Sequence, residues 1–91
     1  MHKIFEPTNA NRAQLALDAL ERFIQSTGVD SARDAIADLV TNLMHLAKAR
    51  DIGTEKLCHD ALGMFKTETE CDDEGDMQSV QDRFRQILPE D

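Results

Sequence analysis

The chain has 91 residues, of which 41% are hydrophobic, and its 18 acidic and 10 basic residues give a net charge of −8. This length supports one hydrophobic core, and the apolar content is too high for a fully disordered chain. Residues 68–91 hold nine acids and two bases, whereas residues 1–67 are nearly neutral. Because no basic patch is present to neutralise phosphates, we expect no direct binding of nucleic acid.

No segment reads as a targeting signal or a membrane span. The N-terminal MHKIFEPT has one lysine and a short apolar patch, and no run reaches the ~18 apolar residues of a spanning helix. We predict a cytoplasmic protein without membrane contact, with a single helical domain over residues 1–91 and flexible ends at residues 1–7 and 89–91. In a reducing compartment, its two cysteines, Cys58 and Cys71, are expected to be free thiols.

The first predicted helix covers residues 9–27. Thr8 or Asn9 can cap its start, and Gly28 can close its end. Leu15 falls outside the apolar stripe of this helix. The stripe recurs at three- and four-residue spacing and comprises Ala13, Leu17, Leu20 and Ile24.

The second predicted helix covers residues 31–50, with Asp30 or Ser31 as its cap. Its apolar side chains span roughly 200° of a helical wheel, about twice the minimum stripe of a surface helix. Such an arc must be covered from more than one side, so this helix is either the central helix of the fold or the seam of a homodimer. The candidate seam comprises Ile36, Leu39, Val40, Leu43, Met44 and Leu46.

Two further helices are predicted at residues 54–68 and 77–88, with Thr54 capping the former and Pro89 ending the latter. Cys58 lies on the apolar side of the third helix, so we expect it to be buried as a small hydrophobic residue. No strand-like alternation occurs, and the predicted class is an all-α fold of about four helices.

Between these two helices, the stretch ETECDDEGDM predicts an acidic hinge at residues 68–76. Its pattern of acids is similar to that of a calcium-binding EF-hand loop with Gly75 at the turn position. However, Gln81 replaces the bidentate glutamate that closes such a site. The segment either contacts a protein partner or only keeps the chain soluble. Its candidate partner-binding residues are Glu68, Glu70, Asp72, Asp73, Glu74 and Asp76.

No other metal or catalytic group emerges from the residue spacing. His45, which we expect at the surface, forms no zinc-ligand pair with His59 or with the two cysteines. The carboxylates around Cys71 oppose its thiolate, which a reactive cysteine requires. We therefore predict no metal, no cofactor and no enzymatic activity.

The run DAIADLVTNLMHLAKARDIGTEKL resembles the second half of MazG-like NTP pyrophosphohydrolases, which hold magnesium between helices with E-E-x-x-E and E-x-x-D motifs. The resemblance implies that Asp38 stands at the terminal acid of the second motif, with Ala35 in place of its glutamate. Asp18 and Glu21 match the last two acids of the first motif, with Leu17 in place of the leading acid. Both metal motifs are therefore degenerate.

The core DAIADLVTNLMHLA, residues 34–47, also resembles small uncharacterised helical proteins of bacterial and mobile-element genomes. That resemblance implies a small cytoplasmic helical protein from a phage, plasmid or integrative element. The preferred hypothesis is a non-enzymatic protein that binds and modulates another protein, such as an anti-CRISPR or anti-restriction inhibitor acting on a basic nucleic-acid-processing complex. The alternative is a magnesium-dependent nucleotide pyrophosphohydrolase with degenerate motifs.

Overall fold

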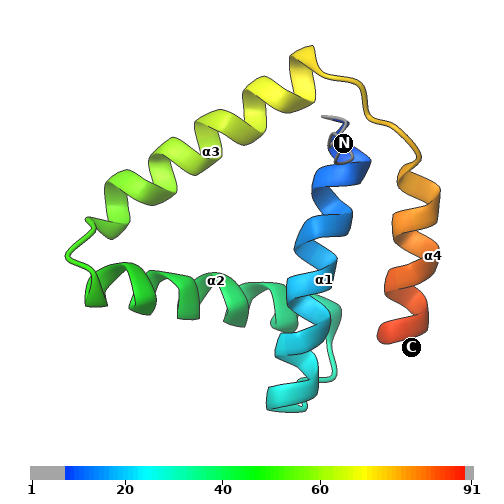
Figure 1. Cartoon of the computed structure of the whole chain (residues 1–91), viewed down its shortest axis with the longest axis horizontal. Coiled ribbons are helices and arrows are strands. Elements are labelled where there is room, and N and C mark those ends of the chain that lie inside the picture. The colour runs from blue at the N-terminus through cyan, green and yellow to red at the C-terminus, as the bar shows by residue number, and fades with distance from the viewer. Residues whose placement is uncertain (1–7, 90–91) are drawn as a thin grey trace, which may run out of the picture.

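The computed structural model describes residues 8–89, which form four α-helices with no strand among them (Figure 1). These are α1 (Asn9–Thr27), α2 (Ala32–Ala49), α3 (Thr54–Cys71) and α4 (Met77–Ile87). The predicted all-α class is confirmed. Helix α3 runs three residues beyond its predicted end, so the connection to α4 is only five residues long. Of the predicted flexible ends, residues 1–7, 90 and 91 lie outside the described residues.

Short-range capping interactions set most of the helix ends. Gly28 adopts a left-handed conformation with φ 73° and donates its backbone N–H to the Ile24 carbonyl, as predicted for the end of α1. The expected cap of α3 is wrong: Gly53 occupies the N-cap position, and Thr54 is the first helical residue, without a side-chain cap. Side-chain oxygens cap the other three helices, from Thr8, Ser31 and Asp76.

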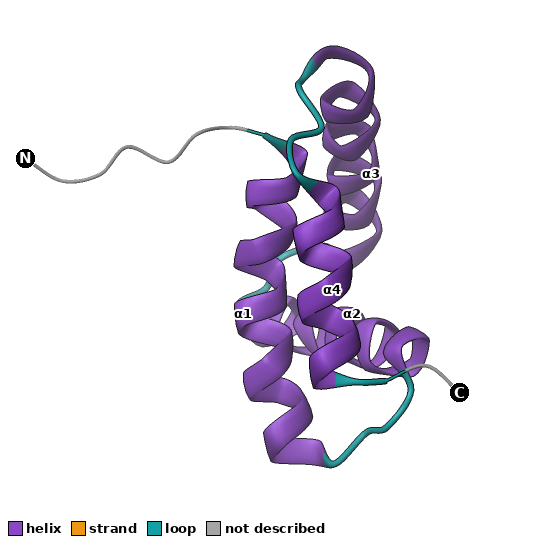
Figure 2. Cartoon of the chain, turned by 90° about the vertical axis from the view of Figure 1, so that its right-hand side faces the viewer, coloured by secondary structure: helices purple, strands orange, loops and turns teal. Residues whose placement is uncertain are grey.

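The core forms where α1, α4 and the beginning of α2 meet. Helices α1 and α4 lie side by side and run in the same direction (Figures 1 and 2). Ala35 on α2 is completely buried and packs in this core with residues of α1 and α4. The other buried residues of this core are Ala10, Leu17, Leu20 and Val80.

Helices α2 and α3 project to one side of the α1–α4 pair. Helix α2 leaves the C-terminal end of α1, and α3 returns to the N-terminal end of α1, so the three helices outline a triangle (Figure 1). We call residues 32–71, which comprise α2, α3 and the turn between them, the arm. No residue of α3 is buried, so the arm is held mainly at its two ends.

Candidate protein-interaction surface

Helix α3 is exposed along its whole length although one side of it is apolar. Only Thr54 near its start and Glu68 near its end are partly covered. Most helical stability in proteins comes from packing an apolar face, and α3 packs little of its own within the chain. The face that α3 would pack includes Leu57, Ala61, Leu62, Met64 and Phe65.

The arm as a whole exposes nine large hydrophobic side chains, each between 40% and 62% accessible. Single exposed hydrophobic residues are normal, but a contiguous group is typical of an interaction site. The nine residues come from α2, the turn and α3: Ile36, Val40, Leu43, Leu46, Ile52, Leu57, Leu62, Met64 and Phe65.

A groove of about 610 Å³ separates α2 from α3. It is lined almost entirely by apolar side chains, and Arg50 is its only charged lining residue. A second apolar groove, of about 330 Å³, lies between α1, α2 and α4. Val40 and Leu43 line both grooves, so one continuous apolar surface extends from the α1–α4 pair across α2 to α3.

The predicted seam residues are divided between these two grooves. Val40 and Leu43 face both of them, as described above. Leu39 and Met44 are half-buried, whereas the other four seam residues are exposed. Ile36 and Leu39 line the smaller groove, and Met44 and Leu46 line the larger one. Whether this seam holds a dimer stays a prediction.

The apolar side of α3 is an exposed surface, whereas the sequence pattern predicts that it is part of the core. Cys58 is the clearest error: it is exposed, with its Sγ atom 3.5 Å from the Met44 Sδ atom at the edge of the larger groove. The prediction of a buried cysteine failed because nothing in the described chain covers α3. Cys71 is also a free, exposed thiol, and His45 lies at the surface as expected.

The acidic segment is tied to the start of α1 by Arg12. The Arg12 guanidinium lies 3.4 Å from Glu68 and 2.9 Å from Asp72, and its side chain is only 27% accessible. Asn9 orients this arginine with a 2.9 Å hydrogen bond from Arg12 Nη1 to its side-chain oxygen. Two of the six predicted partner-binding acids therefore hold the end of α3 against α1.

The turn that follows adds backbone hydrogen bonds to the same contact. The Asn9 and Ala10 N–H groups, which no intrahelical carbonyl can satisfy, donate to the carbonyls of Asp73 at 2.9 Å and Glu74 at 2.7 Å. The Asp73 side chain accepts the N–H of Gly75, which adopts a left-handed conformation with φ 74°. The turn therefore acts as a clamp that fixes α3 and α4 to α1.

Asp76 caps α4 with both carboxylate oxygens. One oxygen accepts the Ser79 N–H at 3.2 Å, and the other accepts the Ser79 hydroxyl at 2.7 Å. These hydrogen bonds, the one from the hydroxyl above all, lower the pKa of the Asp76 carboxyl. Five of the six predicted acids form an ion pair or a side-chain hydrogen bond within the described residues, and the exposed Glu70 is the exception.

This cap predicts a pH-dependent contribution to stability. Because the pKa of Asp76 is lower in the folded than in the unfolded protein, its contribution is present above the unfolded pKa of 3.8 and is lost as the pH falls through the folded value. Asp76→Asn retains a capping oxygen but cannot titrate. Urea unfolding should show wild type more stable than Asp76→Asn at neutral pH, with the difference shrinking below pH 3.8. A difference that stays constant contradicts this role.

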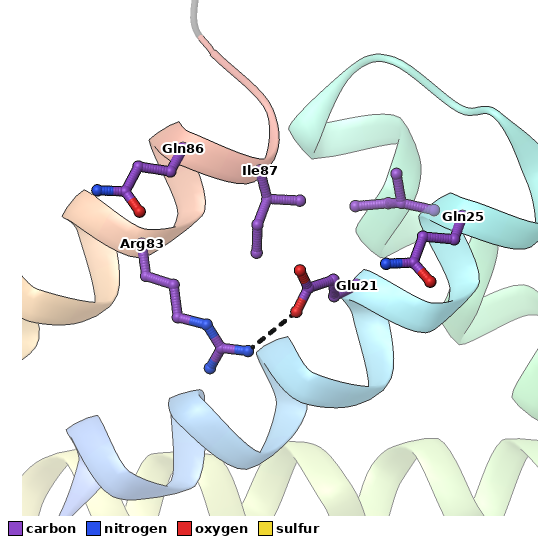
Figure 3. Close-up of a pocket in the computed structure, with 6 residues that line it drawn as sticks. Glu21, Gln25, Arg83, Gln86 and Ile87 are labelled. Carbon is purple, nitrogen blue, oxygen red and sulfur yellow. Dashed lines mark hydrogen bonds and ion pairs between the residues drawn. The ribbon is translucent and has the colours of Figure 1, made fainter.

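A polar cluster around Arg83 joins α1 to α4 (Figure 3). Its guanidinium donates to Gln14 at 2.7 Å, to Asp18 at 2.6 Å and to Glu21 at 3.2 Å. The hydrogen bond to Asp18 and the neighbouring Glu21 raise the pKa of Arg83. A pocket of about 400 Å³ lies beside this cluster, with Gln25, Gln86 and Ile87 on its walls.

This cluster bears on the resemblance to nucleotide pyrophosphohydrolases. Asp18 and Glu21, which match two acids of the first magnesium motif, are both ion-paired with Arg83. Asp38 lies exposed on α2. Within residues 8–89, no three His, Cys, Asp or Glu side chains lie close enough together to hold a metal ion.

Among the described helices, none is long and apolar enough to cross a membrane. No protein-family model, no curated protein and no solved structure matches this chain.

Proposed function

We propose that this chain is a non-enzymatic protein that binds and modulates another protein, with the apolar surface of the arm as the contact. The observation that carries the proposal is helix α3, which has 18 residues, an apolar side and no buried residue. A helix packed against a partner gains the burial that α3 lacks within its own chain. The exposed side chains on α2 extend that contact across both grooves.

The arm supports this role better than the acidic segment does. Five of the six acids form ion pairs or hydrogen bonds within the chain, so a partner would have to compete with the clamp that they build. The charge of the segment still favours encounter with basic partners, an effect on association rate more than on affinity. We therefore propose the arm as the binding surface and the acidic segment as a structural tie.

Engagement of Asp18 and Glu21 by Arg83 supports a non-enzymatic role. A carboxylate that binds magnesium must turn toward the ion, and these two already face a fixed cation across the α1–α4 contact. Incubation of the purified protein with magnesium and a panel of nucleoside triphosphates is expected to release no pyrophosphate. Release that is lost in Asp38→Asn would contradict the proposal.

A matched pair of leucines tests the binding surface. Leu62 and Leu15 are about equally exposed, at 52% and 56%, but Leu62 lies on the apolar side of α3 within the arm, whereas Leu15 lies on α1 outside it. In affinity capture from the native host, Leu62→Glu should lose the proteins that bind wild type, because a charge would be buried in the contact. Leu15→Glu should retain them. Equal capture by both variants would exclude the arm as the binding surface.

A further inference from the structure

The exposed apolar surface of the arm is close in size to one side of a standard protein–protein interface. Nine large side chains that are each about half exposed amount to roughly 700 Å² of apolar surface, at ~150 Å² for each whole side chain. The largest apolar patch of a typical monomer is about 300–600 Å², and one partner of a standard interface contributes about 800 Å². The arm therefore exposes more apolar surface than a monomer ordinarily tolerates.

The charge of the arm identifies which partner fits it. The part of the arm that carries the nine exposed side chains, residues 32–67, holds five acids and five bases, so it is neutral, and the whole excess of −8 lies elsewhere in the chain. A surface that recognises a basic or an acidic partner carries the opposite charge, and this one carries none. Two copies of this neutral part of the arm can approach each other without the repulsion that two acidic segments would experience.

The shape of the arm is also suited to a copy of itself. It presents the groove between α2 and α3 together with the exposed side chains of Met64 and Phe65 on α3. In a two-fold symmetric contact the same patch serves both chains, so each groove can receive the projecting side chains of the other. Two helix pairs packed in this way make a four-helix layer, which is a stable way to bury helical apolar faces.

We infer that the partner seated on the arm is the arm of a second copy, so that the chain forms a homodimer through its α2–α3 surfaces. This inference rests on the proposed function of the arm as a binding surface, and another protein that binds the same surface would have to displace the second copy. The dimer covers the larger groove, including Val40 and Leu43, and buries the exposed side of α3 in both chains. The acidic turns, which lie at the far end of each α3, remain outside the contact.

Sedimentation equilibrium of the purified protein tests the inference. Wild type is expected at twice the chain mass of 10.2 kDa. Leu43→Glu on α2 and Phe65→Glu on α3 should each weaken association at least ~10-fold, because each would place a charge in the contact. Leu15→Glu, on the opposite face of α1, should sediment as wild type does. Leu43 and Phe65 are both exposed in the protomer, so circular dichroism of their variants should show the α1–α4 core still folded.

The possible results separate the dimer from the proposed function. A wild type that stays at 10.2 kDa at high concentration overturns the dimer, whatever the variants do. If that monomer still captures host proteins that Leu62→Glu fails to capture, the arm remains a binding surface for a different protein. A wild-type dimer that neither Leu43→Glu nor Phe65→Glu weakens would place the contact elsewhere and also overturn the inference.

Discussion

Gly75→Ala is expected to destabilise the protein by about 3 kcal/mol, because the substitution meets both backbone strain and a steric clash. Gly75 has a φ of 74°, a conformation that residues with a Cβ rarely adopt. A Cβ at this position would lie 2.8 Å from the Thr8 Oγ1 atom and 2.9 Å from the Thr8 Cβ atom. Thr8 caps α1, so relieving the clash would disturb the clamp between α1 and the turn before α4.

Gly28→Ala is the matched control for this substitution. Gly28 has nearly the same φ, 73°, but an added Cβ would meet no atom within 4 Å. Its substitution should cost about 1 kcal/mol, the strain alone. Urea unfolding gives the loss in free energy of unfolding for each variant, and the difference between the two losses is the cost of the clash. Equal losses would show that the turn can move away from α1 freely, which contradicts its role as a clamp.

Leu17→Ala is expected to destabilise the protein by about 3 kcal/mol, because it leaves a cavity where α1, α2 and α4 meet. Leu17 is only 3% accessible and belongs to the buried core. Leu15, two residues earlier on the same helix, is 56% accessible, so Leu15→Ala should cost less than about 0.5 kcal/mol. Thermal or urea unfolding measures both changes in a matched context.

Similar losses for Leu15→Ala and Leu17→Ala would mean that the outer face of α1 is also covered. In that case the core would not be confined to the α1–α2–α4 junction. The comparison therefore tests whether the buried core of the protomer lies on the α2- and α4-facing side of α1 alone.

Most of the local structure could be predicted from the sequence because it depends on neighbouring residues. The apolar spacing in α1 and the caps at Thr8, Ser31 and Asp76 act over one helical turn. Gly28 likewise ends α1 through its own backbone conformation. These are short-range effects, so a single sequence contains the information needed to place them.

The path of the arm could not be predicted in the same way. The apolar side of α3 indicates that the helix needs a partner, but not whether that partner lies in the same chain. Cys58 shows the consequence, since its place on the apolar side suggested burial and the structure leaves it exposed. Among the apolar patterns, the wide arc of α2 is the one that indicates an additional contact.

The acidic segment was conspicuous by its composition, yet its contacts depend on distant residues. Glu68 and Asp72 pair with Arg12, and the Glu74 carbonyl accepts the Ala10 N–H, across more than fifty residues of sequence. No local pattern reveals such pairs. The composition predicts a partner-binding or solubilising hinge, which stays a prediction, and the contacts add a clamp between α1, α3 and α4 that the composition does not reveal.

The two native thiols offer the most direct measurement of whether the arm is covered by a second copy. Cys58 lines the larger groove, whereas Cys71 lies at the far end of α3 and lines neither groove; both are exposed. Cys71→Ser and Cys58→Ser each leave one thiol, whose rate of reaction with excess Ellman's reagent can be followed as the protein concentration rises. The dimer predicts that Cys58 reacts more slowly at high concentration while Cys71 does not. A Cys58 rate that is independent of concentration would contradict association through the arm.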